Sequence, residues 1–247
     1  MKKVCLKISL CCLSIALISI CAFSQTSTIS INTNRQTIRG FGGMNFPRWI
    51  ADLTSAQATT AFGNGSGQIG LSILRISVPP NSGDWGGEVA TAQRAKSYGA
   101  IVFATPWSPP ASMKSNGSTV GGSLNSSSYG AYANHLRDFC NYMSNNGASL
   151  YAISVQNEPD WVPDYESCGW SASQMRTFLD NNASVIPVLV IAPETVNPQS
   201  SWYNTLSSAS QLDIYADHLY YELGGGRGLG LRVSPPSPRR DLPNWSP

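Results

Sequence analysis

The sequence has few charged residues and few histidines. Asp, Glu, Lys and Arg make up 12% of its 247 residues, and its two histidines are His135 and His218. Lys2, Lys3 and Lys7 lie at the extreme amino terminus, so 13 of the 16 basic residues remain beyond it, against 14 acidic residues. This balance gives no reason to expect a nucleic-acid partner. Two isolated histidines do not indicate a catalytic metal, and we expect no cofactor.

Cysteine is scarce outside the amino-terminal segment. Four of the 6 cysteines lie within the first 21 residues, which leaves Cys140 and Cys168. Two cysteines are too few for a disulfide framework or a zinc site. We expect Cys140 near the end of a helix and Cys168 in a loop on the opposite face of the fold. Because bridged Cα atoms must lie within about 7 Å, no disulfide is predicted.

Residues 1–24 have the pattern of a secretory signal peptide. A basic start precedes an apolar run over residues 8–23, and small residues stand at −3 and −1 of a cleavage site before Gln25. The run is too short for a comfortable transmembrane span. The bulky Ile20 argues against acylation of Cys21. We therefore expect a secreted, extracellular monomer with no membrane association after cleavage.

The rest of the sequence alternates strand signals with helix signals. Short apolar runs rich in β-branched residues predict strands, and apolar residues at three- and four-residue steps predict helices. Strands are expected at residues 38–45, 71–78, 100–105, 150–155, 187–192 and 212–219. Helices are expected at residues 88–98, 127–146 and 199–208, and after the capping boxes at residues 54–57 and 171–174.

Six alternations with short connections predict an α/β fold with a parallel sheet. An open doubly wound sheet is one possibility, but no Gly-x-Gly-x-x-Gly follows the first strand, and polar or aromatic residues follow every strand. This pattern favours a (β/α)8 TIM barrel. Six units make that barrel incomplete, with the partial domain at residues 25–221. Residues 222–247 include five Gly and five Pro and no apolar period, which predicts a disordered tail, and a shifted reading frame is one hypothesis for it.

The clearest candidate for chemistry is Glu158, which follows a buried strand directly after Asn157. The alternative for such an Asn-Glu-Pro is a helix cap or surface turn. Glycoside hydrolysis needs two carboxyl groups, and Glu158 fits the acid if nearby aromatic residues raise its pKa. The second carboxylate stays open between Glu194 and Glu222, and Glu194 is more typical of a structural strand end. His218 is a site candidate, whereas His135 is expected at the surface or in packing.

Several long motifs resemble glycoside hydrolase family 30, most closely its bacterial xylanase branch, which includes glucuronoxylanases. The resemblance covers residues 36–221. The motifs are Gly40-Phe-Gly-Gly-Met-Asn45, Ile73-Leu-Arg-Ile76, Phe103-Ala-Thr-Pro-Trp-Ser-Pro-Pro-Ala-Ser-Met113, Tyr151-Ala-Ile-Ser-Val-Gln-Asn-Glu-Pro-Asp160, Ile191-Ala-Pro-Glu194 and His218-Leu-Tyr220.

The resemblance implies a barrel with an attached β-sandwich and a retaining mechanism that uses an acid/base after strand four and a nucleophile after strand seven. Glu158 then resembles the acid/base, with Asn157 beside it. The nucleophile and the arginine that grips glucuronate have no counterpart here, and residues 26–32 alone resemble the sandwich. We therefore expect a poorly folded, nearly inactive chain. The residues that resemble the lining of the sugar cleft are Trp49, Trp85, Trp107, Trp161, His218 and Tyr220.

The resemblance makes an endo-β-1,4-xylanase or glucuronoxylanase the leading hypothesis, with xylan or glucuronoxylan as the substrate. A glucosylceramidase-like or other β-glycosidase of the same family is one alternative. A non-catalytic carbohydrate-binding remnant is another. An open-sheet nucleotide-binding protein is less favoured, because no phosphate-binding loop is visible.

Overall fold

The computed structural model describes residues 38–220. The chain divides after Arg39, and the described strands and helices all belong to the unit that begins at Gly40. The predicted signal peptide, the sandwich-like residues 26–32, Glu222 and the tail at residues 222–247 lie outside the described residues.

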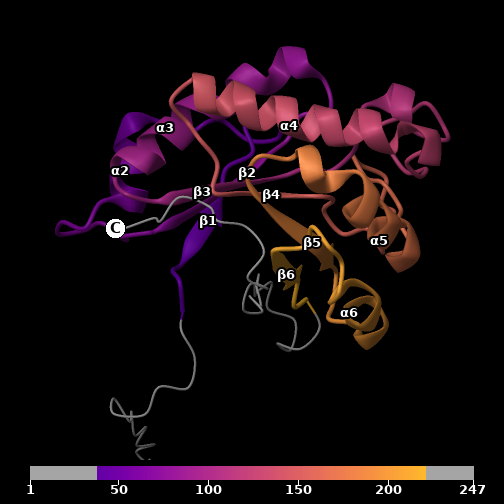
Figure 1. The fold of residues 1–247 in the computed structure, drawn as a ribbon. Coiled ribbons are helices and arrows are strands. Elements are labelled where there is room, and N and C mark those ends of the chain that lie inside the picture. Colours follow the sequence, from indigo (N-terminus) through magenta and orange to yellow (C-terminus); the bar gives the residue numbers. More distant parts are fainter. Residues whose placement is uncertain (1–37, 221–247) are drawn as a thin grey trace, which may run out of the picture. The chain divides into compact units, whose positions relative to one another are not determined.

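Six parallel strands form one sheet in the order of the chain, from β1 to β6 (Figure 1). Each strand pairs in parallel with the next one. The sheet is a half-barrel, as expected for an incomplete (β/α)8 barrel, and the α/β prediction is confirmed. The strands are β1 (Gly42–Met44), β2 (Ile73–Ser77), β3 (Ile101–Thr105), β4 (Ala152–Ser154), β5 (Leu189–Thr195) and β6 (Ile214–Asp217).

Helices connect the successive strands, because a parallel pair needs a crossover. Figure 1 shows the long α4 lying over one side of the sheet, with α3 and then α2 toward the β1 end. The α-helices are α2 (Ser55–Phe62), α3 (Val89–Ser97), α4 (Tyr129–Asn145), α5 (Ala172–Asn181) and α6 (Ser200–Leu206). Short 3-10 helices are η2 (Ser82–Glu88), η3 (Ala111–Met113), η4 (Ser126–Ser128) and η5 (Ala183–Val185). None of the helices within residues 38–220 has the length and apolar character to cross a bilayer.

Local sequence signals set the ends of these helices. Thr54 and Ser171 form the two predicted capping boxes, in which each side chain accepts from the backbone N–H three residues on. Gly99 and Gly147 follow α3 and α4 with φ of 85° and 68°. These left-handed values favour glycine, so both helices end where the sequence predicts.

Strand β5 runs farther than expected. The sequence predicts its end at Ala192, but the strand continues through Pro193 to Thr195. A register shift between Pro193 and Thr195 accommodates the proline, which has no N–H for the ladder. The longer strand carries Glu194 into the sheet instead of leaving it just beyond.

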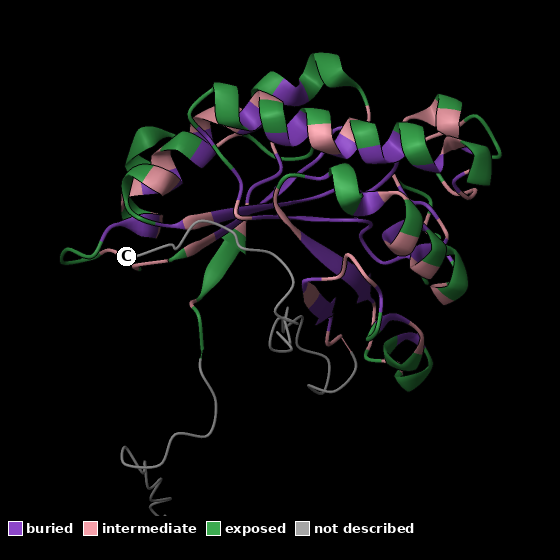
Figure 2. Cartoon of the chain, in the orientation of Figure 1, coloured by how far each residue is buried: buried purple, intermediate pink, exposed green. Residues whose placement is uncertain are grey.

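Side chains alternate between the two faces of each strand. Leu74, Val102 and Ile153 belong to the large core shared with α4, where Leu136 and Phe139 are fully buried. Figure 2 shows that the strands from β2 to β6 are mostly buried, that β1 is largely exposed, and that the helices are exposed on their outer sides.

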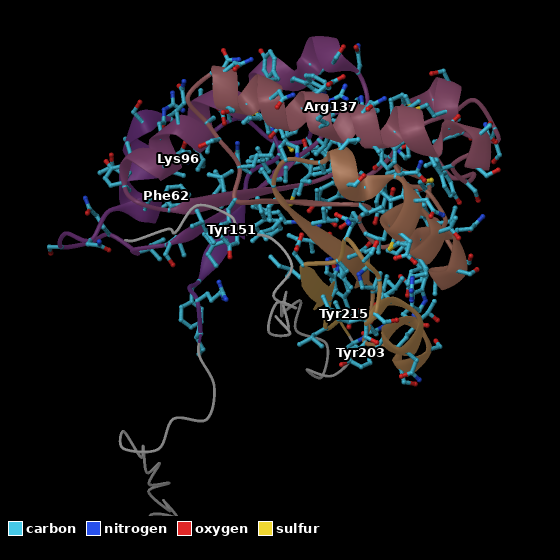
Figure 3. All side chains as sticks on the ribbon, in the orientation of Figure 1. Phe62, Lys96, Arg137, Tyr151, Tyr203 and Tyr215 are labelled. Atoms are coloured by element: carbon cyan, nitrogen blue, oxygen red, sulfur yellow. The ribbon has the colours of Figure 1, made fainter. Side chains whose placement is uncertain are left out.

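The face of the sheet away from this core has its own small cluster. Phe103, Ala152, Ile191 and Ala216 pack together there, and the partly buried Tyr151, labelled in Figure 3, packs against them. Two positions farther along the strands, polar residues follow the apolar ones on the same face. These polar residues are Arg75, Thr105 and His218.

Candidate active site

The chain turns sharply at the end of β4. Glu158 has φ of 46°, in the left-handed region that non-glycine residues seldom occupy. Its N–H donates to the carbonyl of Glu194 (3.1 Å), and the N–H of Asn157 donates to that of Pro106 (2.9 Å). Both residues are buried. The backbone of Asn157 and Glu158 is therefore hydrogen-bonded to the ends of both neighbouring strands. This burial excludes the alternative of an exposed surface turn.

The Glu158 carboxylate is bound by two residues that follow β6. His218 Nδ1 lies 2.9 Å from Glu158 Oε1, so the ring N–H donates to the carboxylate. The Tyr220 hydroxyl also hydrogen-bonds to Glu158, and the rings of His218 and Tyr220 meet edge to face. The structure thus brings three predicted site residues into contact.

These contacts overturn the expected pKa of Glu158. Burial acts to raise this pKa, as anticipated, but hydrogen bonds from His218 and Tyr220 and the charge of Arg75 together lower it below its ordinary value. Glu158 is therefore an ionised carboxylate in this arrangement. In this state it can accept a proton. To act as an acid it must first be protonated, which requires a change in its surroundings that raises its pKa.

Arg75, on β2, connects the polar residues of the site, although no sequence motif indicated a role for this residue. Its Nη2 donates to Asn157 Oδ1 (2.8 Å) and to Glu194 Oε2 (2.7 Å). Its guanidinium also lies 4.7 Å from the centroid of the Trp107 ring. A guanidinium can only donate hydrogen bonds, so the amide oxygen of Asn157, and not its NH2 group, points toward Arg75. A charged residue inside an apolar strand was the signal that could have identified it.

Glu194 is held too tightly to act as a free carboxylate. It is fully buried, pairs with Arg75 and accepts from the Thr105 hydroxyl (3.1 Å). His218 Nε2 lies 3.9 Å from Glu194 Oε2. Glu194 therefore has the geometry of the structural strand-end residue that the sequence favoured.

Aromatic rings gather beside Glu158. The backbone N–H of Trp161 donates to the carbonyl of Glu158 (3.0 Å), and Trp161 is 51% exposed. Trp107 is buried, and Trp49, 50% exposed, meets it edge to face at 6.0 Å. Tyr165, which the sequence analysis did not single out, contacts Trp49 at 5.5 Å. Trp49 and Trp107, two of the four predicted tryptophans, therefore lie in one group of rings, and Trp161 lies next to it in the turn that follows Glu158.

Trp85 does not belong to the group. Its ring packs on His135 and on Phe139 and Tyr142 of α4, and it is 7% exposed. Its indole N–H donates to the carbonyl of Pro79 (3.0 Å). The expected cleft position is therefore wrong, because core side chains enclose this indole. His135 packs there as predicted, and burial lowers its pKa.

Two further features bear on the chemistry. Within residues 38–220, no cluster of three or more His, Cys, Asp or Glu side chains could hold a metal ion. Cys140 and Cys168 are buried free thiols, and burial raises the pKa of Cys168 to about 11. A thiol with this pKa stays protonated and unreactive at neutral pH.

The fold and site define a class: an incomplete (β/α)8 barrel with a buried carboxylate and an aromatic group at the strand ends. No family model matches the chain. It is 47% identical over 201 residues to glucuronoxylanase XynC of Bacillus subtilis strain 168, which covers 78% of this chain and 47% of the relative. The chain belongs to glycoside hydrolase family 30 and is a homologue of its glucuronoxylanases.

Solved structures agree with this assignment. The family 30 subfamily 8 xylanase Xyn30A from Clostridium acetobutylicum is 42% identical with a TM-score of 0.69, over 76% of this chain and 51% of that one. A family 30 endoxylanase from Clostridium papyrosolvens is 33% identical with a TM-score of 0.67, over 77% of this chain and 52% of that one. The chain thus spans about half the length of these relatives.

Proposed function

We propose that this chain is part of a retaining endo-β-1,4-xylanase that acts on xylan or glucuronoxylan, with Glu158 as the acid/base. The observation that carries the proposal is the setting of Glu158. It lies at the carboxyl end of β4, beside Asn157 and in contact with His218 and Tyr220. Catalytic groups of (β/α)8 barrels come from this end of the strands. The names of the relatives supply the substrate class.

In a retaining reaction, Glu158 first donates a proton to the leaving glycosidic oxygen while a second carboxylate attacks the anomeric carbon. It then removes a proton from the water that hydrolyses the glycosyl-enzyme. Asn157, with its oxygen held by Arg75, is placed to bind a sugar hydroxyl. A bound sugar that displaces the hydrogen bonds from His218 and Tyr220 would raise the pKa of Glu158 and allow it to be protonated.

The second carboxylate is the incomplete part of the site. Glu194 is buried and paired with Arg75, so it is not available for attack. We infer that the nucleophile is not among residues 38–220 and that this chain hydrolyses xylan extremely slowly by itself. Loss of a catalytic nucleophile commonly removes several orders of magnitude of rate.

A non-catalytic carbohydrate-binding role is the second candidate. It is favoured by the half-exposed rings of Trp49 and Trp161 beside a site with one available carboxylate. Exposed aromatic rings provide flat apolar surfaces that can pack on sugar rings.

One experiment tests both the xylan proposal and the inferred lack of a nucleophile. Binding of the chain to insoluble glucuronoxylan and to mannan is measured by depletion, together with the release of reducing ends. We expect binding to glucuronoxylan and no release above that of Glu158→Gln. Release at enzyme-like rates, about 1 s⁻¹ or more, would contradict the inferred lack of a nucleophile. Equal binding to both polysaccharides would contradict the xylan proposal.

We also propose, from the pattern of residues 1–24, that the protein is exported. We propose that the exported protein is a monomer. Amino-terminal sequencing of protein recovered outside the cell is expected to begin at Gln25. An uncleaved amino terminus would overturn the export proposal.

A further inference from the structure

Two long loops at the carboxyl ends of the strands are joined along their length. We call residues 106–125 the β3 loop and residues 159–171 the β4 loop. Isolated bridges pair Val120 with Glu166 and Ser123 with Gly169. The Ser167 N–H also donates to the carbonyl of Thr119 (3.0 Å). These backbone contacts make the two loops one unit.

The buried Lys114 strengthens the same junction. Its Nζ donates to Ser108 Oγ (3.0 Å) in the β3 loop and to the carbonyl of Ser167 (2.6 Å) in the β4 loop. A buried ammonium needs such acceptors, so it holds both loops to one geometry. The β4 loop is therefore a fixed support for whatever contacts it.

A third loop, at residues 45–54 and here called the β1 loop, is attached to this support through a two-pronged ion pair. Arg48 Nη1 and Nη2 donate to Glu166 Oε1 and Oε2 at 2.7 and 2.8 Å, although the residues are 118 positions apart. Both side chains are largely shielded from solvent. Parallel hydrogen bonds between a guanidinium and a carboxylate fix orientation as well as distance.

The residues next to this pair carry two of the exposed rings of the aromatic group. Trp49 follows Arg48 and Tyr165 precedes Glu166, and their rings meet edge to face with centroids 5.5 Å apart. Trp49 also stacks on Phe46 at 4.2 Å, and the Arg48 guanidinium lies over the same Phe46 ring. The ion pair therefore lies directly beside the contact between Trp49 and Tyr165.

We propose that Arg48 and Glu166 are a positioning pair that holds Trp49 and Tyr165 as a preformed wall for sugar rings beside Glu158. The inference rests on the proposed carbohydrate function and adds a residue pair that contacts no sugar itself. A wall that is already ordered binds a neutral saccharide without the entropy cost of immobilising two large side chains and a loop. Without the ion pair, each binding event has to order these side chains, and the affinity for the sugar is lower.

The test measures the affinity of the full 247-residue chain for xylohexaose by calorimetry in four variants. Arg48→Ala and Glu166→Ala are each expected to raise Kd about tenfold, since one factor of ten corresponds to ordering one or two side chains. Arg48→Lys keeps the charge but not the fork, so an intermediate Kd is expected. The double variant Arg48→Glu with Glu166→Arg is expected to restore Kd to within about threefold.

The matched control is Arg137→Ala. Arg137 also forms an ion pair, with Asp138 at 2.8 Å, but it lies on the outer side of α4 (Figure 3). This variant is expected to leave Kd unchanged. If Arg48→Ala behaves like Arg137→Ala, or if the double charge reversal binds no better than Arg48→Ala, the proposal is overturned.

A second readout needs no sugar. Acrylamide quenching of tryptophan fluorescence is compared with and without Trp49→Phe, so that the difference reports Trp49. Arg48→Ala should increase quenching of Trp49, and the charge-reversed double variant should reverse the increase. Failure of the unaltered chain to bind xylohexaose would count against the proposed function, whereas unchanged Trp49 quenching would count against the positioning pair. Because quenching is read on folded protein, the milder Arg48→Lys replaces Arg48→Ala in this measurement if Arg48→Ala unfolds.

Discussion

His218 Nδ1 lies 2.9 Å from Glu158 Oε1, although the two residues are 60 positions apart in the chain. The parallel order of the sheet produces this contact. Glu158 follows β4, His218 follows β6, and Glu194 between them belongs to β5, so neighbouring carboxyl ends converge. The contact sets the ionisation of Glu158 and supports its proposed role.

We predict that His218→Ala raises the pKa of Glu158, because the substitution removes two of the effects that lower it. A carboxyl group with a lowered pKa in the folded state adds stability above its unfolded pKa of 4.5, and this stability is lost as pH falls through the folded pKa. His218→Ala should therefore lose stability at pH 7 and less at acidic pH. Carbon-13 NMR titration of the glutamates measures the shift.

His135→Ala is the matched control for this titration. His135 packs on Trp85 in the core, so its removal should leave the Glu158 resonance unchanged. An equal shift in both variants would mean that His218 does not act through its hydrogen bond.

Glu88 should make the free energy of unfolding depend on pH in the opposite direction from Glu158. Burial raises its pKa to about 7 from 4.5, although a hydrogen bond with Ser77 opposes the shift. The folded state then binds the proton more tightly than the unfolded state, so stability falls as pH rises from about 4.5 to 7. The loss is on the order of 3 kcal/mol. Urea unfolding at pH 5 and pH 8 measures it.

Glu88→Gln should flatten this dependence, because glutamine carries no charge and can still hydrogen-bond to Ser77. Asp138→Asn, at an exposed position on α4, should leave it unchanged. A slope that persists in Glu88→Gln would assign the effect to another group.

Arg75→Met should strongly destabilise the chain. It leaves Glu194 as a buried charge without its cation, which costs about 3–5 kcal/mol. Adding Glu194→Gln should recover part of the loss, because the uncompensated charge is then gone. Arg137→Ala, which breaks an exposed pair, should cost at most about 1 kcal/mol in the same urea series. Equal losses for Arg75 and Arg137 would refute the central role of Arg75.

Substitutions of Trp85 and Trp161 should differ in their effects, the first on stability and the second on sugar affinity. Trp85→Phe should lower the free energy of unfolding and leave xylohexaose affinity unchanged, because this indole is enclosed in the core. Trp161→Ala should weaken affinity about tenfold or more, with a small effect on stability. Calorimetry and urea unfolding together measure both. Weaker sugar binding by folded Trp85→Phe would restore Trp85 to the cleft.

Much of the fold could be predicted from local signals. Strand alternation predicted the parallel sheet, and the capping boxes at Thr54 and Ser171 placed two helices, because these signals depend on neighbours within four residues. The buried strand end also singled out Glu158. The family resemblance then assigned His218 and Tyr220 to the lining of the sugar cleft.

The features that could not be predicted depend on contacts between distant residues. The direction of the Glu158 pKa shift results from hydrogen bonds with residues that follow a different strand. Trp85 and Trp107 are both aromatic residues that follow strands, but Trp85 packs on Phe139 of α4, whereas Trp107 lies against the guanidinium of Arg75. Arg75 gains its role from Asn157, 82 positions away. The hydrophobic periodicity of the sequence does not indicate which of these distant residues come into contact.

The most direct test of the site is an NMR titration of the seven tryptophan indoles with xylohexaose, in the intact chain labelled with nitrogen-15 at tryptophan. Binding beside Glu158 predicts that the indole N–H signals of Trp49 and Trp161 move and that those of Trp85 and Trp202, both buried, stay in place. Saturable binding that moves Trp85 or Trp202 and leaves Trp161 unchanged would contradict a sugar site beside Glu158.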